Sequence, residues 1–175
     1  FLAASTDREN AQAQSFEADV REKITAIATP TVWVTLEINQ MDDENADFET
    51  TLAELRKEFG KAVAPVQIPF NDEDGKFVGF INVIKRDARK KVDGKLQKCA
   101  MPEDKVDQVE KLRAMVIEVA AESSEELMEK FFNDEELTEE EIYDGLLAGI
   151  EAMSVAPVLC GSATLGYGVK LMMNT

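Results

Sequence analysis

Apolar positions at strand and helix spacing divide the N-terminal third of the chain into alternating elements. Residues 1–4 and 32–38 are mainly apolar and rich in strand-forming residues, and residues 6–28 carry apolar side chains three and four positions apart, as one face of a helix does. The order strand, helix, strand predicts a parallel βαβ unit with a right-handed crossover. A second helical stripe follows at residues 48–59, and Gly60 is placed to cap its C-terminus.

The period then changes to that of strands. The segments of strand period are residues 63–70, 76–84 and 89–99, and the turn sequences are residues 71–75 and 93–94. Short strands joined by glycine-containing turns predict an antiparallel meander. Pro65 and Pro69 have no N–H for a ladder hydrogen bond, so the first strand is expected at a sheet edge or at a bend.

Residues 103–150 return to the helical period. The apolar positions of the first expected helix are Val109, Leu112, Val116 and Val119, and those of the last are Ile142, Leu146 and Ile150. The pairs Ser123 with Glu126 and Thr138 with Glu141 have the spacing of capping boxes. We therefore expect three short helices in this segment.

A final apolar run at residues 155–160 has strand character. Pro157 lies inside this run and cannot donate a hydrogen bond, so the strand is expected at the outer edge of the parallel sheet. A closing helix is expected from about Gly168. The pattern as a whole, with strands and helices alternating around a separate run of strands, predicts the α/β class.

Composition narrows the classes of function. The chain has 175 residues, of which 45% are hydrophobic and 31% are charged, enough for one ordinary core with a small addition. No apolar run approaches the ~20 residues that span a bilayer, and the start has no basic flank of a signal peptide. Cys99 and Cys160 form no disulfide framework or metal-ligand pattern, which suits a reducing cytoplasm. The sequence contains no histidine, which excludes histidine bases and histidine metal ligands.

The net charge of −16 is unevenly distributed. Residues 103–144 contain sixteen acidic and four basic residues, a local charge of −12, whereas residues 76–98 contain eight basic and two acidic, a local charge of +6. The basic stretch could contact RNA, but only Phe77 and Phe80 are available for base stacking. We therefore favour the alternative, in which its lysines protect a strand edge from pairing with other chains.

Polar residues interrupt the apolar pattern where the strand at residues 32–38 ends. Asn39 offers an amide there, and Asp42 offers a carboxylate just before the next helical stripe. Ligands of open α/β sheets bind beyond the carboxyl ends of strands, so both side chains are placed to read a planar, hydrogen-bonding ligand. The alternative is an ordinary turn, because Asn and Asp also bond their own backbone.

The stretch from Asn39 to Phe48 resembles the guanine-reading loop of translational GTPases, Asn-Lys-x-Asp, and its second half resembles elongation factor G in particular. Further segments appear in that family's order and approximate spacing at residues 60–69, 124–132, 137–142 and 160–163. The resemblance covers about residues 30–173. It implies that residues 1–62 and 154–175 form a partial P-loop-GTPase-like parallel sheet and that residues 63–153 form an inserted α+β subdomain.

The resemblance also implies the residues of a guanine site. Asn39 and Asp42 would read the base, the N–H of Ala163 would meet the guanine carbonyl oxygen, and Ser162 would shape the second loop. Gln40 stands where the family has a lysine whose stem packs on the nucleotide. Its shorter, uncharged side chain weakens the expected binding of guanine.

An intact protein of this kind hydrolyses GTP, with magnesium, to drive ribosomal translocation in the cytoplasm. The phosphate-binding pattern Gly-x-x-x-x-Gly-Lys-Ser/Thr is absent from this sequence, and the family's other catalytic segments would lie upstream. We therefore expect a fragment that is inactive alone and binds neither GTP nor GDP tightly. The alternative is a non-catalytic protein-interaction module derived from a translational GTPase.

The acidic segment has two interpretations. Such a run is commonly a solvated helix face. In elongation factor G, however, the first helix of the inserted subdomain contacts the basic C-terminal domain of the ribosomal stalk protein. The positions of Glu118, Glu122 and Glu125 match that family's acidic ones, and Asp107 and Glu110 extend the same face. The resemblance thus implies a docking surface, with the ribosome as partner.

Overall fold

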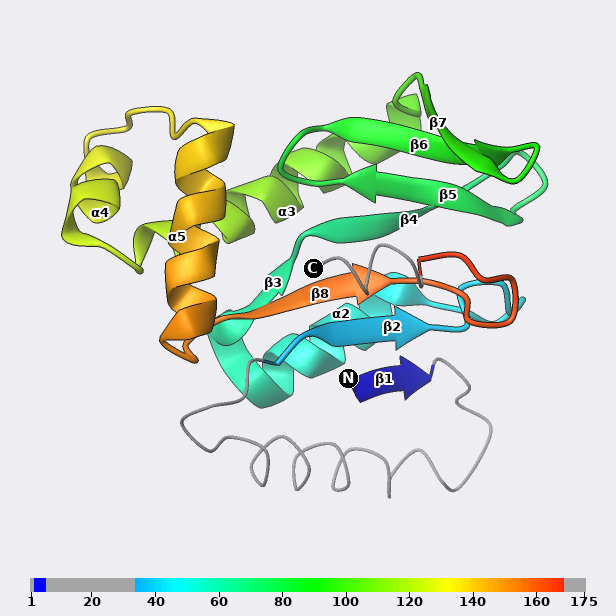
Figure 1. The fold of residues 1–175 in the computed structure, drawn as a ribbon, viewed down its shortest axis with the longest axis horizontal. Helices are drawn as coiled ribbons and strands as arrows, with labels where there is room; N and C mark the ends of the chain where they lie inside the picture. Colours follow the sequence, from blue (N-terminus) through cyan, green and yellow to red (C-terminus); the bar gives the residue numbers. More distant parts are fainter. Residues whose placement is uncertain (1, 6–33, 169–175) are drawn as a thin grey trace.

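The computed structural model describes residues 2–5 and 34–168. The helices expected at residues 6–28 and after Gly168 lie outside these ranges, as does the crossover between the first two strands. The described residues form an α/β fold with one parallel and one antiparallel sheet (Figure 1). The expected class is therefore confirmed.

The parallel sheet contains four strands in the order β1, β2, β8, β3 (Figure 1). The strands are β1 (Leu2–Ser5), β2 (Leu36–Asn39), β8 (Ala156–Cys160) and β3 (Val63–Pro65). All neighbouring pairs run parallel. The strand at residues 156–160 therefore lies between two others, and its expected position at the sheet edge was wrong.

The register explains why Pro157 is tolerated inside the sheet. Pro157 pairs with Ala64 of β3, whereas pairing with β2 begins one residue later, at Val158. The carbonyl of Val158 accepts a hydrogen bond from the N–H of Val66, so Val158 faces the β3 side. Backbone groups alternate in direction along a strand, and Pro157 therefore faces β2 before β2 has begun. Its missing N–H costs no ladder bond.

The antiparallel sheet is a meander in sequence order, as expected (Figure 1). Its strands are β4 (Gln67–Asn71), β5 (Phe77–Asn82), β6 (Asp87–Val92) and β7 (Lys95–Cys99). The β6–β7 turn places Asp93 and Gly94 at φ 49° and 79°. Such values suit an Asp-Gly hairpin, because both residue types tolerate the left-handed region.

The run at residues 63–70 divides between the two sheets. β3 joins the parallel sheet and β4 opens the antiparallel one, so the sheets change at Val66 and not at residue 63. The N–H of Val66 donates to Val158 and its carbonyl accepts from Val83, which links both sheets through one residue. Both strands lie at sheet edges, which explains how Pro65 and Pro69 are accommodated.

Some of the helices lie behind the strands, and the others lie beside the two sheets (Figure 1). They are α2 (Phe48–Phe59) with a 3-10 turn, η1 (Gly60–Ala62), and then α3 (Glu103–Ala121), α4 (Glu125–Phe132) and α5 (Glu139–Glu151). α2 packs on β2 and β3, and α3 packs on α4, α5 and β3. Three helices do follow the meander, but the first is long, with 19 residues.

The two expected capping boxes had different outcomes. Thr138 accepts the N–H of Glu141, and the Glu141 carboxylate accepts the N–H of Thr138, so this box is confirmed. The cap of α4 is Ser124, which accepts the N–H of Leu127 at 3.2 Å. The Ser123 hydroxyl instead donates to the carbonyl of Ala120. The longer α3 places Ser123 one position too early to cap α4.

One hydrophobic core joins the two sheets and the helices. Its fully buried side chains include Ile38 and Val158 of the parallel sheet, Ile81 of the antiparallel sheet, and Val116 and Ile142 of the helices. Continuous apolar burial of this kind is the main stabilising term for a domain of this size. No helix within residues 34–168 is long and apolar enough to cross a membrane.

Candidate functional site: the loops after β2 and β8

The loops that follow β2 and β8 meet because their strands are neighbours in the parallel sheet. The N–H of Gly161 donates to the carbonyl of Ile38, and the N–H of Met41 donates to the carbonyl of Gly161, each at 3.0 Å. Met41 is buried and anchors the first loop beneath the polar residues. The ladder thus continues past the strand ends and holds the two loops edge to edge.

A side-chain hydrogen bond also joins the two predicted base-reading loops. The Asn39 Oδ1 atom accepts the N–H of Ala163 at 2.9 Å, although 124 residues separate them. The structure therefore brings together the Asn39 amide and the Ala163 N–H, the two groups that the resemblance assigns to one ligand. In this state the Ala163 N–H is satisfied by Asn39.

The remaining residues of the first loop point in different directions. Gln40 has φ 61°, and its carbonyl accepts the N–H of Asp43 to form a tight turn. The side chain of Asp42 is exposed to solvent. The carboxylate of Asp42 is therefore accessible to an incoming ligand, as are the neighbouring exposed side chains of Asp43 and Glu44.

Ser162 is buried within the second loop and forms hydrogen bonds across it. The residue is fully buried, and its Oγ accepts the N–H of Leu165 at 3.1 Å. Its backbone exchanges two hydrogen bonds with Tyr167, each 2.9 Å long. The hydroxyl and the backbone of Ser162 thus hold together the loop that contains Ala163.

A buried carboxylate lies under this junction. Glu37 in β2 is 7% exposed, and burial raises the pKa of its carboxyl group. A Cβ added at Gly161 would lie 2.6 Å from Glu37 Oε1 and 2.7 Å from the Tyr167 carbonyl oxygen. Burial, followed by the nearby Glu37 charge, raises the pKa of the Cys160 thiol well above its ordinary value. Cys160 is therefore an unreactive core residue.

The acidic residues predicted for partner docking are not equally free. Lys61 pairs with Glu118 and, at 3.5 Å, with Glu122, and these carboxylates raise the pKa of Lys61. Glu110 forms a two-point bond with Arg86, at 2.6 and 2.9 Å, which lowers the pKa of Glu110. Three of the five predicted carboxylates thus face cations of the same chain and not solvent alone.

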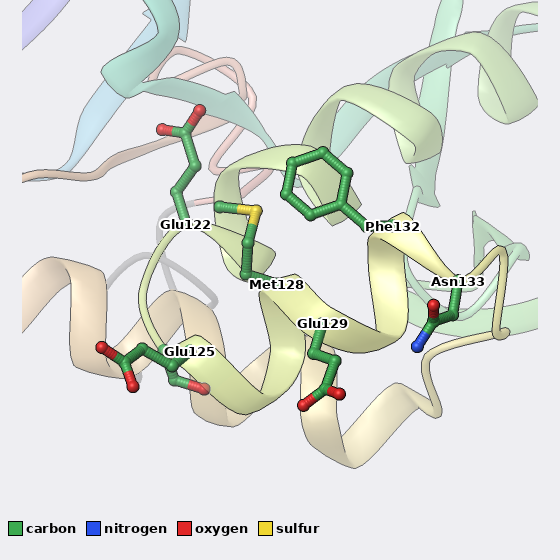
Figure 2. A pocket seen from close by; sticks show the side chains of 7 residues that line it. Glu122, Glu125, Met128, Glu129, Phe132 and Asn133 are labelled. Atoms are coloured by element: carbon green, nitrogen blue, oxygen red, sulfur yellow. The ribbon is translucent and has the colours of Figure 1, made fainter.

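Asp107 and Glu125 are exposed, and Glu125 lines a groove where α3 meets α4 (Figure 2). The groove has a volume of about 460 Å³ and is lined by Glu122, Ser124, Glu125, Met128, Glu129, Phe132 and Asn133. Phe132 is 76% exposed, an unusual position for a phenyl ring. An apolar floor of Met128 and Phe132 is thus bordered by three carboxylates, with no basic residue in the lining.

The basic stretch is largely engaged within the domain. Arg89 and Lys98 both pair with the buried carboxylate of Asp87, at 2.8 and 3.4 Å. The ammonium groups of Lys85 and Lys91 lie over the rings of Tyr143 and Tyr167. Lys95 and Lys98 lie on β7, an exposed edge strand, where lysines discourage pairing with other chains.

The groove and the support of the second loop were not predicted from the sequence. Two adjacent phenylalanines, Phe131 and Phe132, were a usable signal, because neighbours on a helix cannot both face its buried side. Tyr167, Phe77 and Lys91 carry no comparable signal, since they meet only in the folded chain. Within residues 2–5 and 34–168, no group of three or more His, Cys, Asp or Glu side chains is arranged to hold a metal ion.

No known protein-family model matches the chain. Its structure is similar to the crystal structure of a protein from Thermus thermophilus, with a TM-score of 0.78 and 23% sequence identity. The match covers 99% of this chain but 25% of the Thermus protein. At this identity the likeness shows the fold alone. The chain is therefore an α/β domain whose fold recurs as about a quarter of a longer protein.

Proposed function

We propose that this chain is the guanine-base side of a GTPase similar to elongation factor G, together with its inserted subdomain. The observation that carries the proposal is the contact between the Asn39 and Ala163 loops at the carboxyl ends of two neighbouring parallel strands. Such strand ends are the usual ligand site of open α/β sheets. The phosphates and magnesium are handled by residues outside this chain, because its sequence has no phosphate-binding loop.

The geometry suggests how a guanine base is recognised. The exposed Asp42 carboxylate accepts the two N–H groups on one edge of the base. The guanine carbonyl oxygen accepts the Ala163 N–H and replaces Asn39 Oδ1, which frees the Asn39 amide to turn to the base. Each step exchanges one hydrogen bond for another, so base binding adds discrimination more than affinity.

A nucleoside titration followed by NMR tests this proposal on the chain itself. Guanosine at millimolar concentration should shift the amide signals of Ala163 and Asp42, whereas adenosine should not. Asp42→Asn should reverse the preference towards xanthosine, because an amide at this position can donate to the oxygen that replaces the guanine amino group. If guanosine and adenosine shift the same signals equally, the base-reading proposal is wrong.

A second function is supported by a different observation, the acidic groove formed by α4 and the turn that precedes it. We propose that it docks a basic partner, for which the resemblance to elongation factor G suggests the C-terminal domain of the ribosomal stalk protein. The apolar floor of Met128 and Phe132 offers a contact that excludes water, and the carboxylates around it steer a lysine-rich surface towards it. This function would persist in a module that had lost nucleotide binding.

The structure selects which residues to change. Glu125 and Glu129 are exposed on α4, whereas Glu118 and Glu122 already pair with Lys61 of the same chain. Glu125→Lys with Glu129→Lys should slow association with the stalk domain at low salt. A matched control is Glu73→Lys with Asp74→Lys in the exposed β4–β5 turn, which makes the same change in charge far from the groove.

Phe132→Ser tests the apolar floor separately. Because Phe132 is 76% exposed, its replacement should leave the stability of the chain nearly unchanged and should speed dissociation of the partner. If the association rate falls equally in the groove variant (Glu125→Lys with Glu129→Lys) and in the turn control, the net charge of the chain, and not the groove, determines the rate. Unchanged binding in both Phe132→Ser and the groove variant would exclude this surface as the docking site.

A further inference from the structure

The antiparallel sheet holds the loop after β8 from the side opposite Asn39. The Tyr167 ring lies 5.6 Å from the Phe77 ring, which makes an edge contact with Phe80 at 5.3 Å between centroids. The ammonium group of Lys91 lies 4.0 Å from the centroid of the Tyr167 ring, well within the range of a cation–π interaction. Side chains of β5 and β6 thus converge on a single residue of the loop.

Tyr167 is also the backbone partner that closes the loop. Its N–H donates to the Ser162 carbonyl, and its carbonyl accepts the Ser162 N–H. The N–H of Gly166 donates to the Ala163 carbonyl at 3.2 Å, and the N–H of Ala163 donates to Asn39. A displacement of Tyr167 is therefore transmitted through two hydrogen bonds to Ser162, the residue that precedes Ala163.

The backbone that follows Tyr167 is closely packed. Gly168 has φ 86°, and a Cβ added there would lie 2.9 Å from the Cys160 carbonyl oxygen and 3.4 Å from the Phe80 ring. The chain after Tyr167 consequently runs directly between the end of β8 and the aromatic side chains of β5. The loop is held on one side by the parallel sheet and on the other by the antiparallel sheet.

We propose that Tyr167 is the positioning residue of the Ser162–Ala163 loop, and that Phe77 and Lys91 hold it there. The antiparallel sheet thereby sets the direction of the Ala163 N–H, the group assigned to the guanine carbonyl oxygen. This role deepens the proposed guanine site and rests on it for its purpose. The positioning itself is a property of this chain and can be measured without any nucleotide.

Hydrogen exchange of the Ala163 amide, followed by NMR on the 175-residue chain, reports the positioning directly. Tyr167→Ala should accelerate exchange at Ala163 about tenfold, because the loop loses its aromatic support, whereas Tyr167→Phe should restore a rate within about twofold of the parent. Lys91→Ala should give an increase of about two- to fivefold, and Lys91→Arg should remove that increase, because arginine can also stack on the ring.

Tyr143→Ala is the matched control. Tyr143 in α5 also lies beneath a lysine, with Lys85 Nζ 5.4 Å from its ring centroid, but it is not part of the loop. Its replacement should leave exchange at Ala163 unchanged. The amides of Ile38 and Val158, in the central strands, report global stability, so faster exchange there would identify general unfolding.

The outcomes separate positioning from base reading. If Tyr167→Ala leaves Ala163 exchange within about twofold of the parent, Tyr167 does not position the loop. If Tyr167→Ala speeds exchange equally in the central strands and Lys91→Ala has no effect at Ala163, the contact is only structural, and the proposal is equally wrong. If both variants free the Ala163 amide but guanosine does not perturb it in the parent chain, the positioning stands and the guanine site fails.

Discussion

Gly79 shows how one residue controls the pairing of two strands. A Cβ at Gly79 would lie 2.0 Å from the Arg89 carbonyl oxygen and 2.7 Å from Lys90 Cα, both in the backbone of β6. Backbone atoms cannot move aside without breaking the ladder between β5 and β6. Glycine is therefore required here by space, although its φ does not lie in the left-handed region.

We expect Gly79→Ala to destabilise the chain by about 3 kcal/mol, at the upper end of the cost of overpacking. Gly94→Ala is the comparison, because Gly94 has open space around its Cα but φ 79°. Its cost should be about 1–2 kcal/mol, that of an alanine in the left-handed region. Urea unfolding of both variants checks the order, and a larger loss for Gly94→Ala would contradict the close packing at Gly79.

Glu37 makes stability depend on pH through one buried carboxyl group. Because burial raises its pKa in the folded chain, the folded state holds this proton more tightly than the unfolded state. Its contribution therefore favours folding at low pH and weakens as pH rises from the ordinary carboxyl pKa through the raised value. Glu37→Gln should remove this fall, so the variant should gain stability over the parent at pH 7 relative to pH 4.

Unfolding free energies between pH 4 and pH 8 measure this effect. Glu140→Gln, in an exposed position on α5, is the control and should keep the pH dependence of the parent. A parallel pH profile for Glu37→Gln and the parent would show that Glu37 does not titrate differently in the folded chain.

At the scale of elements, helix starts depend on which residue precedes the first turn. Ser124, and not Ser123, accepts the N–H of Leu127 and so caps α4. Ser124→Ala should cost about 1 kcal/mol, the typical value for a lost N-cap, and Ser123→Ala should cost less. Thermal or urea unfolding decides between them. The reverse order would restore Ser123 as the cap.

The carboxylate of Glu141, at the start of α5, changes the stability of the chain with pH in the opposite direction to Glu37. The ammonium group of Lys130, followed by the backbone and hydroxyl of Thr138, lowers the pKa of Glu141 to about 2. This contribution is present above the ordinary carboxyl pKa and is lost as pH falls towards 2. Glu141→Gln should therefore flatten the acid side of the stability profile, whereas Glu140→Gln should not. If the stability of Glu141→Gln and of the parent falls equally as the pH is lowered, Glu141 does not stabilise the folded chain in this way.

At the scale of the whole molecule, the two sheets are joined by continuous chain and by one core. Val66 bonds to both sheets, to Val158 through its N–H and to Val83 through its carbonyl. Val66→Pro removes the first bond and should destabilise both sheets together, by about 1–3 kcal/mol. Val66→Ala keeps the N–H and should cost less.

Hydrogen exchange in the two sheets measures this coupling. Protection of Ile38 in β2 and of Ile81 in β5 should fall by the same factor in Val66→Pro, because both belong to one buried core. A loss confined to one sheet would show that the sheets unfold as separate units.

The chain alone should not hydrolyse GTP. Catalysis of phosphoryl transfer depends on groups that hold the phosphates and orient water, and the pattern that supplies the phosphate loop is absent from this sequence. Phosphate release should equal that of a control without protein. Steady release in preparations free of contaminating GTPase would overturn this expectation, while nucleoside binding would remain a separate test.

The sequence by itself determined the local elements of this protein. The meander, the helical stripes, the Asp93–Gly94 turn and the Thr138–Glu141 box all depend on residues within a few positions of one another, where steric preference and side-chain period act directly. The position of Asn39 and Asp42 after a buried strand was visible for the same reason. So was the α/β class, which follows from the order of the elements.

Only the tertiary structure decided how these elements combine. The central place of β8, the division of one apolar run at Val66, the pairing of Glu118 with Lys61 and the support of the second loop by Tyr167 all join residues that lie far apart in the chain or depend on which strands are neighbours. Periodicity says which side of an element is buried, but not against which partner. That choice is made by packing of the whole core, in which many weak contacts are satisfied together.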